Sequence, residues 1–118
     1  MNKTQKDNII TNSVFQKALC CKVSTITTIE AKAASFTVGL EEDGKLFEVD
    51  ATGGSVTATL PAALDAKGRT YRFKYFAGAN NFVLDGAGAE TIDGAATSSN
   101  TGTGYTEVVS NGVQWLIL

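Results

Sequence analysis

Histidine is absent from this chain of 118 residues, and proline, tryptophan and methionine occur only once each. The missing imidazole excludes the Ser-His-Asp and Cys-His nucleophile systems and the H-E-x-x-H class of zinc protease. Cysteine is scarce too, because the only two, Cys20 and Cys21, are adjacent. Neighbours this close rarely pair, so we expect reduced residues that pack in an interior, without a disulfide framework or a zinc site. These absences predict a protein that has no cofactor and no metal.

Long apolar runs and a strong net charge are also missing. No segment approaches the roughly 20 apolar residues of a membrane-spanning helix, and the first residues lack the apolar stretch of a signal peptide. The formal net charge is −2, which creates no overall field toward nucleic acid or anionic membranes. We therefore expect synthesis in the cytoplasm, with neither nucleic acid nor a membrane as partner.

The residues that are present are typical of an all-β protein. The chain has 12 glycines and many threonines, and short alternating apolar runs are separated by Gly, Asn and Asp. This pattern predicts about eight short strands. No helices alternate with them, so a parallel α/β sheet is disfavoured. The predicted fold is a small β-sandwich or jelly-roll-like module of short antiparallel strands.

Alternation within the strand candidates also predicts the core, because every second residue of a strand faces the same way. In T-Y-R-F-K-Y-F, Tyr71, Phe73 and Tyr75 face one side of the sheet and the two cations face the other. The predicted core of the module contains Val56, Leu60, Tyr71, Phe73, Trp115 and Ile117.

Four segments are among the predicted connections between strands. Asp43-Gly44 is a strong hairpin dipeptide, and Ala62–Gly68 suits one helical turn with a glycine exit. Residues 77–81 are predicted to form a turn, and residues 94–104, rich in Gly, Ser and Thr, a flexible loop.

The first 34 residues differ from the rest and contain no glycine. Residues 13–21 place apolar side chains on one face of a candidate short helix, and the β-branched segment 23–29 favours an extended chain. We interpret residues 1–34 as an N-terminal arm that needs another surface to lie on, and residues 35–118 as the β module. The alternative is that the arm supplies a first strand and helix to the same domain.

No constellation of residues predicts catalysis. Asp43, Asp85, Glu90 and Asp93 lie in or beside turns, where acidic residues are common. Their spacing is not that of a calcium-binding loop, and a glycosidase pair would need a cleft that a domain of this size hardly offers. The glycine-rich segments do not open a helix and are not phosphate loops.

The basic residues are concentrated in one place. Lys67, Arg69, Arg72 and Lys74 alternate in part with aromatics, a combination that binds single-stranded nucleic acid in some proteins. Because alternation places the cations and aromatics on opposite faces, a solvated sheet face is the favoured interpretation. The cations could also meet acidic groups of a partner subunit.

The C-terminal two-thirds resemble a recurring module of tailed bacteriophages. The resemblance covers about residues 45–118 and depends on the order and spacing of four segments. These are V-T-A-T-L-P-A-A at 56–63, K-G-R-T-Y-R-F-K at 67–74, N-N-F-V-L-D-G-A-G-A-E-T-I-D-G-A at 80–95, and the closing Y-T-E-V-V-S-N-G-V-Q-W-L-I-L. Similar modules occur in capsid decoration (cement) proteins, head fibres and tail-fibre tips.

The resemblance implies a compact, usually trimeric β module without enzymatic activity. Because the chain has no heptads or second module for a shaft, we expect a capsid decoration protein on the outer surface of the virion. It would bind the major capsid protein as a homotrimer and stabilise the shell. The apolar residues of the arm would contact the capsid, namely Ile9, Ile10, Val14, Phe15 and Leu19.

The alternative is a tail-fibre or baseplate tip that binds a host receptor or a glycan. Its ligand would meet the loop 94–104 and the aromatics Tyr71, Tyr75 and Tyr105. A depolymerase is a third, weaker hypothesis.

The closing V-Q-W-L-I-L segment carries apolar residues on both faces. Alternation places Trp115 and Ile117 in the module's own core and Leu116 and Leu118 on the opposite face. A sheet with one wet face would have polar residues there. We therefore predict that Leu116 and Leu118 form the trimer interface.

Overall fold

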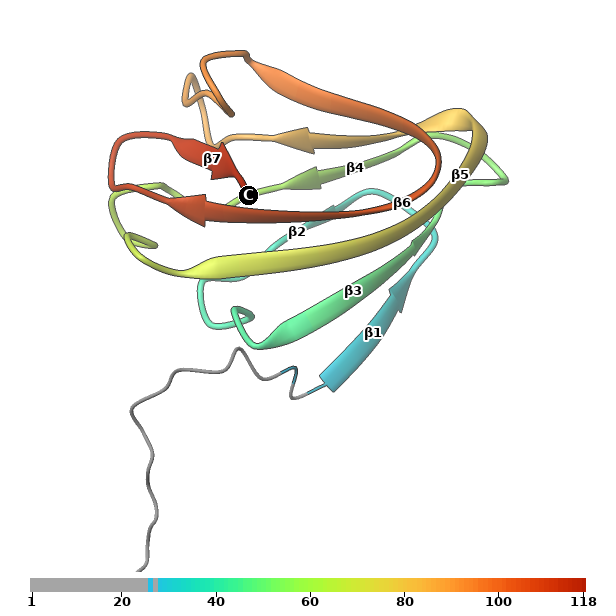
Figure 1. Cartoon of the computed structure of the whole chain (residues 1–118), viewed down its shortest axis with the longest axis horizontal. Coiled ribbons are helices and arrows are strands. Elements are labelled where there is room, and N and C mark those ends of the chain that lie inside the picture. Colours follow the sequence, from blue (N-terminus) through green and yellow to red (C-terminus); the bar gives the residue numbers. More distant parts are fainter. Residues whose placement is uncertain (1–25, 27) are drawn as a thin grey trace, which may run out of the picture.

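The computed structural model describes residue 26 and residues 28–118, and every regular element in this part is a strand. All strands belong to one sheet, shown in Figure 1. They are β1 (Thr28–Lys32), β2 (Phe36–Thr37), β3 (Lys45–Asp50), β4 (Val56–Thr59), β5 (Thr70–Asp85), β6 (Thr97–Ser110) and β7 (Trp115–Ile117).

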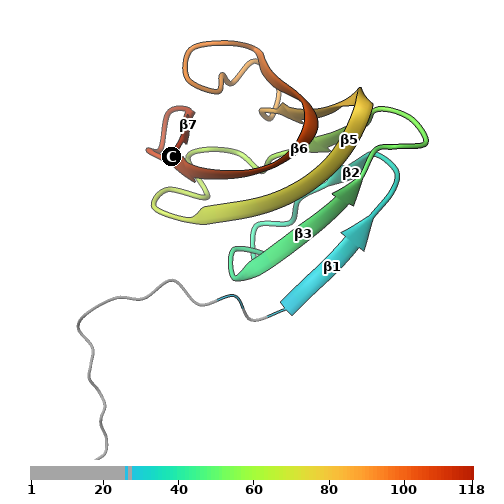
Figure 2. The same cartoon turned by 45° about the vertical axis from the view of Figure 1, so that its right-hand side comes forward.

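The predicted antiparallel sandwich is wrong, although the prediction of a strand-rich protein is confirmed. Five strands form the path β1-β3-β5-β4-β2, and every pairing along it is parallel. Only β6, which pairs with β5, and β7, which pairs with β6, are antiparallel to their neighbours. The sheet curls into a half-barrel in place of two separate packed sheets (Figures 1 and 2).

The long strands bend, and the bend divides the sheet into two limbs. Because β6 follows one edge of β5, β3 and β4 share the other edge, β3 beside residues 72–76 and β4 beside residues 82–85. The first limb therefore contains β1, β3 and the first half of β5, and the second contains β2, β4 and the second half of β5. Each pass of the chain runs through the first limb and then the second, first as β1 and β2, then as β3 and β4, and then as the two halves of β5. Successive passes lie on one another like partial coils of a solenoid.

Side-chain and backbone bonds hold the successive bends in register. The amide of Asn80 donates hydrogen bonds to the carbonyl oxygens of Ala51 (2.8 Å) and Thr52 (3.0 Å) in the bend below. The backbone N–H of Asn81 donates to Oγ of Ser55 at 3.1 Å. Leu46 pairs with Arg72 and Val56 with Phe82, so the sequence separation between the two passes is the same in both limbs.

The core lies between the two limbs. Phe82 of the second limb contacts Phe73 and Tyr75 of the first, with ring centroids 5.5 Å apart in both pairs. Of the predicted core residues, Val56, Leu60, Tyr71, Phe73 and Trp115 are buried, whereas Ile117 is 38% exposed. Ile117 points to the same face as Trp115 and pairs with Val108 of β6, but it lies at the margin of the sheet.

Two predicted connections are strands in the structure. Residues 77–81, predicted as a turn, are the bend inside β5, and most of the predicted loop 94–104 is the first half of β6. Gly78 and Gly102 have φ of +60° and +75°, so glycine permits the bend at both positions. A bend within a strand and a turn between strands have similar composition, which explains the error.

The other two connections differ from each other. The Asp43-Gly44 segment is not a hairpin, because the strands on its two sides, β2 and β3, do not pair. It returns the chain from the second limb to the first. Residues 62–68 form the expected single helical turn, closed by a bond from the Ala66 N–H to the Ala62 oxygen at 3.1 Å.

Strand β1 lies within the segment assigned to the arm from sequence. It pairs with β3 over its whole length, so residues 28–32 are part of the sheet. The candidate helix at 13–21, Cys20 and Cys21 lie outside the described residues.

Candidate interaction surfaces

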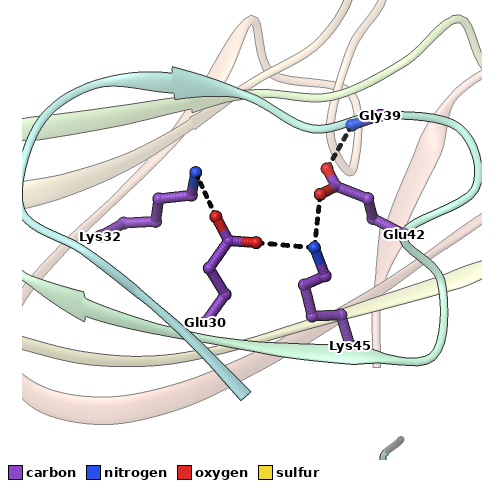
Figure 3. Close-up of polar contacts among 5 residues, drawn as sticks. All are labelled: Glu30, Lys32, Gly39, Glu42 and Lys45. Atoms are coloured by element: carbon purple, nitrogen blue, oxygen red, sulfur yellow. Dashed lines mark hydrogen bonds and ion pairs between the residues drawn. The ribbon is translucent and has the colours of Figure 1, made fainter. Parts of the chain in front are cut away.

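A cluster of charged side chains lies at the β1 end of the sheet (Figure 3). Lys45 Nζ is 2.6 Å from Glu30 Oε1 and 2.7 Å from Glu42 Oε2. Lys32 Nζ is 2.7 Å from the other oxygen of Glu30, and the Gly39 N–H donates to Glu42 Oε1 at 2.7 Å. Each carboxylate therefore has two donors, and the chain of contacts joins β1, β3 and the connection between β2 and β3.

The cluster covers aromatic residues at this end of the core. Lys32 Nζ is 5.1 Å from the ring centroid of Phe36, and Lys45 Nζ is 5.6 Å from that of Phe47. The register pairs Glu30 with Phe47, so Glu30, Lys32, Lys45 and Phe47 share one face of the sheet. Cations over aromatic faces are attracted by the ring quadrupole. The cluster thus closes the end of the stack with groups that satisfy one another.

The lysines shift the acidity of the cluster. Hydrogen bonds from Lys32 and then Lys45 lower the pKa of Glu30 from 4.5 to about 2. For Glu42, burial acts to raise the pKa, but hydrogen bonds from Lys45 and Gly39 outweigh it and the pKa is lowered. Hydrogen bonds to Glu30 and Glu42 raise the pKa of Lys45. Glu30, Glu42 and Lys45 are therefore charged at neutral pH.

A pH dependence of stability follows from Glu30. Because its pKa is lower in the folded chain, its contribution is present above pH 4.5 and disappears as the pH falls toward 2. We expect Glu30→Gln to be less stable than the parent at pH 7 and nearly as stable near pH 2. Urea unfolding of both proteins across this range measures the difference. Glu41→Gln, an exposed neighbour outside the cluster, is the control, and a constant Glu30→Gln difference would contradict the assignment.

A second surface lies on the sheet face turned away from the core. The register aligns four residues across it, one from each of β1, β3, β5 and β6, and together with Leu118 we call them the outer row. Leu118 joins this row because its N–H donates to the Glu107 oxygen at 2.9 Å. The outer row contains Ile29, Leu46, Arg72, Glu107 and Leu118.

The outer row is apolar at its ends and charged in the middle. Ile29 is 65% exposed and Leu118 is 70% exposed. Between them Arg72 Nε is 3.3 Å from Glu107 Oε2, with the Arg72 side chain only 6% exposed. The Tyr105 hydroxyl donates to the other oxygen of Glu107 at 3.3 Å. Because the two charges neutralise each other, the row offers a partner apolar contact without a net charge.

The predicted interface residues lie on this face. Leu116 is half-buried and pairs with Val109 of β6, one row away from Leu118. Both leucines therefore face away from Tyr71 and Phe73 of the core, and Leu118 has most of its surface in solvent.

Three of the four basic residues contact groups of the same chain. Arg69 Nη1 is 3.2 Å from Asp43 Oδ1 and also donates to the Leu40 oxygen at 3.2 Å. Arg72 is engaged by Glu107, and Lys74 Nζ lies 5.8 Å from the ring centroid of Phe76. Arg69 and Arg72 thus meet acidic groups of the same chain.

The acidic turn residues hold backbone in place. Glu90 accepts the Ala63 N–H through both oxygens, at 2.9 and 3.2 Å, and Asp93 Oδ1 accepts the Ile117 N–H at 3.2 Å. Asp85 accepts the Leu60 N–H through its backbone oxygen. Within residues 26 and 28–118, no group of three or more Cys, Asp or Glu residues could hold a metal ion.

The three aromatic residues that the glycan-binding alternative requires differ in how far they are buried. Tyr71 is fully buried and donates its hydroxyl to the Leu40 oxygen, and Tyr75 is 9% exposed. Burial, with a smaller effect of Asp43, raises the pKa of Tyr71 to about 12. Tyr105 alone of the three is well exposed, at 50%.

The predicted capsid-contact residues Ile9, Ile10, Val14, Phe15 and Leu19 lie outside the described residues. Sequence reasoning missed the charged cluster, because Glu30 and Lys45 meet only through the β1–β3 register. It also missed the first half of β6, since that segment was predicted to be a loop.

Comparison with known proteins gives no family for the chain. No protein-family model matches it, and no curated protein is significantly similar to it in sequence. Residues 26 and 28–118 contain no helix that could span a lipid bilayer.

Proposed function

We propose that this protein is a non-enzymatic structural component of a phage virion, a decoration protein that binds the outside of the capsid as a homotrimer. The proposal combines the resemblance of residues 45–118 to phage surface modules with one observation, the exposed apolar ends of the outer row. Large apolar side chains that remain in water at the ends of a row with no net charge favour contact with another protein surface.

The outer row supplies the contact between subunits in this proposal. Burying one leucine side chain contributes on the order of 1.5–3 kcal/mol, and a symmetric assembly repeats that contribution in every subunit. Leu118 and Ile29 lie at opposite ends of the same row, so each end can meet the other end of a neighbouring copy in a closed ring. The Arg72–Glu107 ion pair between them has no net charge, so it does not repel the same ion pair of a neighbouring copy.

The subunit contact is tested by Leu118→Asp. We expect the parent to sediment as a trimer of the 12.4 kDa chain and the variant to have a lower mass with an unchanged far-UV spectrum. Leu64→Asp is the matched control, since Leu64 is 74% exposed but lies in the β4–β5 connection. A parent that sediments as a monomer, or a variant with the parent's mass, would contradict the subunit contact.

The capsid role requires a separate experiment. Purified protein mixed with undecorated capsids is expected to co-sediment with them and to raise their resistance to heat. Specific binding to a glycan array without capsid binding would replace the proposal by a receptor-binding tip.

A further inference from the structure

One edge of the sheet is open along the first half of β6. Strand β5 occupies one side of β6 from Thr97 to Val109. On its other side β7 pairs only with residues 108–110, and Leu118 adds one bond to Glu107. Within the described part of the chain, no strand borders residues 97–105 on that side. Figures 1 and 2 show this half of β6 in orange at the rim of the sheet.

The open edge of β6 lacks the features that protect edges from pairing. Exposed edges of natural sheets are blunted by charges, proline or extra residues in the strand. Strand β1, the edge strand of the first limb, has Glu30 and Lys32. The sequence T-S-S-N-T-G-T-G of residues 97–104 has no charge and no proline. Where the pairing between β5 and β6 is irregular, the extra residues belong to β5. Strand β6 therefore has no bulge that would protect its open edge.

The sequence of the edge is complementary to itself. When two copies pair antiparallel about Asn100, Thr97 faces Thr103, Ser98 faces Gly102, and Ser99 faces Thr101. Asn100 then faces Asn100, and every other pair combines small or hydroxyl-bearing residues, which suit cross-strand contact. Gly102, whose φ is +75°, meets a small serine at the point where the strand bends. A contact of this kind has two-fold symmetry, with the same residues from both copies.

We propose that residues 97–103 of β6 bind the same segment of a second copy of this chain, as an antiparallel strand pair centred on Asn100. The inference does not rest on the proposed function. It uses a different edge from the outer row, and its two-fold symmetry differs from that of a ring. Only one short strand from each copy enters the contact, so the dimer is weak and its population rises with protein concentration.

The test is carried out in the full-length Leu118→Asp chain, so that the outer row does not contribute to the mass. We expect sedimentation equilibrium to show a monomer that becomes a dimer as the concentration rises. Two further variants carry Ser99→Lys with Thr101→Lys, or Ser99→Glu with Thr101→Glu. Both positions are exposed, and residue 99 of one copy faces residue 101 of the other. Each variant alone therefore opposes like charges and should stay monomeric.

Mixing the two variants in equal amounts should restore the dimer, because lysines then face glutamates. An unfolded variant would not be rescued in this way. Asp65→Lys, at an exposed site in the β4–β5 connection, is the control and should dimerise like its parent. Dimerisation of either charged variant alone, or the absence of a dimer in the mixture, would overturn the inference.

Hydrogen exchange distinguishes a second copy from the chain's own residues as the cover of this edge. Amides of residues 97–103 that point away from β5 should exchange quickly in dilute protein and slowly at concentrations that give the dimer. Slow exchange at every concentration would overturn the inference, because the edge would then be covered within one chain.

Discussion

Replacing Trp115 by alanine is expected to lower the free energy of unfolding by about 3–5 kcal/mol. Its side chain is fully buried and packs edge-on against Tyr71, with ring centroids 5.5 Å apart. The indole N–H donates to the Pro61 oxygen at 3.3 Å, so the substitution also leaves that acceptor without its partner. A domain of this kind is stable by about 5–15 kcal/mol in total, and the loss would take a large part of it.

The backbone around Trp115 explains why the cavity cannot close easily. Its N–H donates to Thr91 at 3.0 Å, its oxygen accepts from Asp93 at 2.8 Å, and its register partner on the other side is Ser110. The strand is therefore fixed between two segments and cannot move inward. Urea unfolding measures the effect. Val113→Ala, two residues earlier and 77% exposed, should change stability by less than about 0.5 kcal/mol. Equal effects of the two substitutions would contradict this account.

Replacing Glu107 by alanine is expected to cost about 3 kcal/mol, because it leaves a buried guanidinium without its counter-ion. Arg72 is 5% exposed, and Glu107 is the only acidic group in contact with it within the described part of the chain. The expected cost is at the lower end for a broken buried pair, since the Glu107 side chain keeps 23% of its surface in solvent.

The matched control for Glu107→Ala removes both charges. Apolar residues of similar volume can replace a buried ion pair with little loss, so the double variant Arg72→Leu and Glu107→Leu should be more stable than Glu107→Ala. Denaturant unfolding of the parent and both variants gives the comparison. A double variant at least as unstable as Glu107→Ala would contradict this account. It would show that the ion pair does more for the stability of the fold than neutralise two charges.

Alternation in the sequence predicts strands but does not specify their partners. In β5 it correctly places Tyr71 and Phe73 on the opposite face from Arg72, because successive side chains of a strand alternate between its two faces whichever neighbours it has. It does not predict that Arg72 is buried too, at 5% exposed. Parallel and antiparallel pairing leave the same alternating pattern when one face is covered. The hairpin expected at Asp43-Gly44 was wrong for this reason, since a loop between two limbs of a curled sheet also needs a tight turn.

The interaction surfaces were predictable only where one segment contains them. The outward direction of Leu116 and Leu118 follows from alternation in the last strand. The cluster of Glu30 with Lys45 depends on a register between strands 15 residues apart, which no local pattern encodes. The same is true of Arg72 with Glu107, whose contact exists because β6 returns along the edge of β5.

The matched bends of the successive passes have a consequence for how such a chain can change in length. Asn80 and Asn81 of one bend bind the bend below, and the two passes keep the same sequence separation in both limbs. A single inserted residue near Ala51 would shift one limb against the other and turn core side chains toward solvent. A whole extra pass would preserve every contact, because each pass contacts only its neighbours. The architecture therefore tolerates length variation in units of a complete pass and resists it in units of one residue.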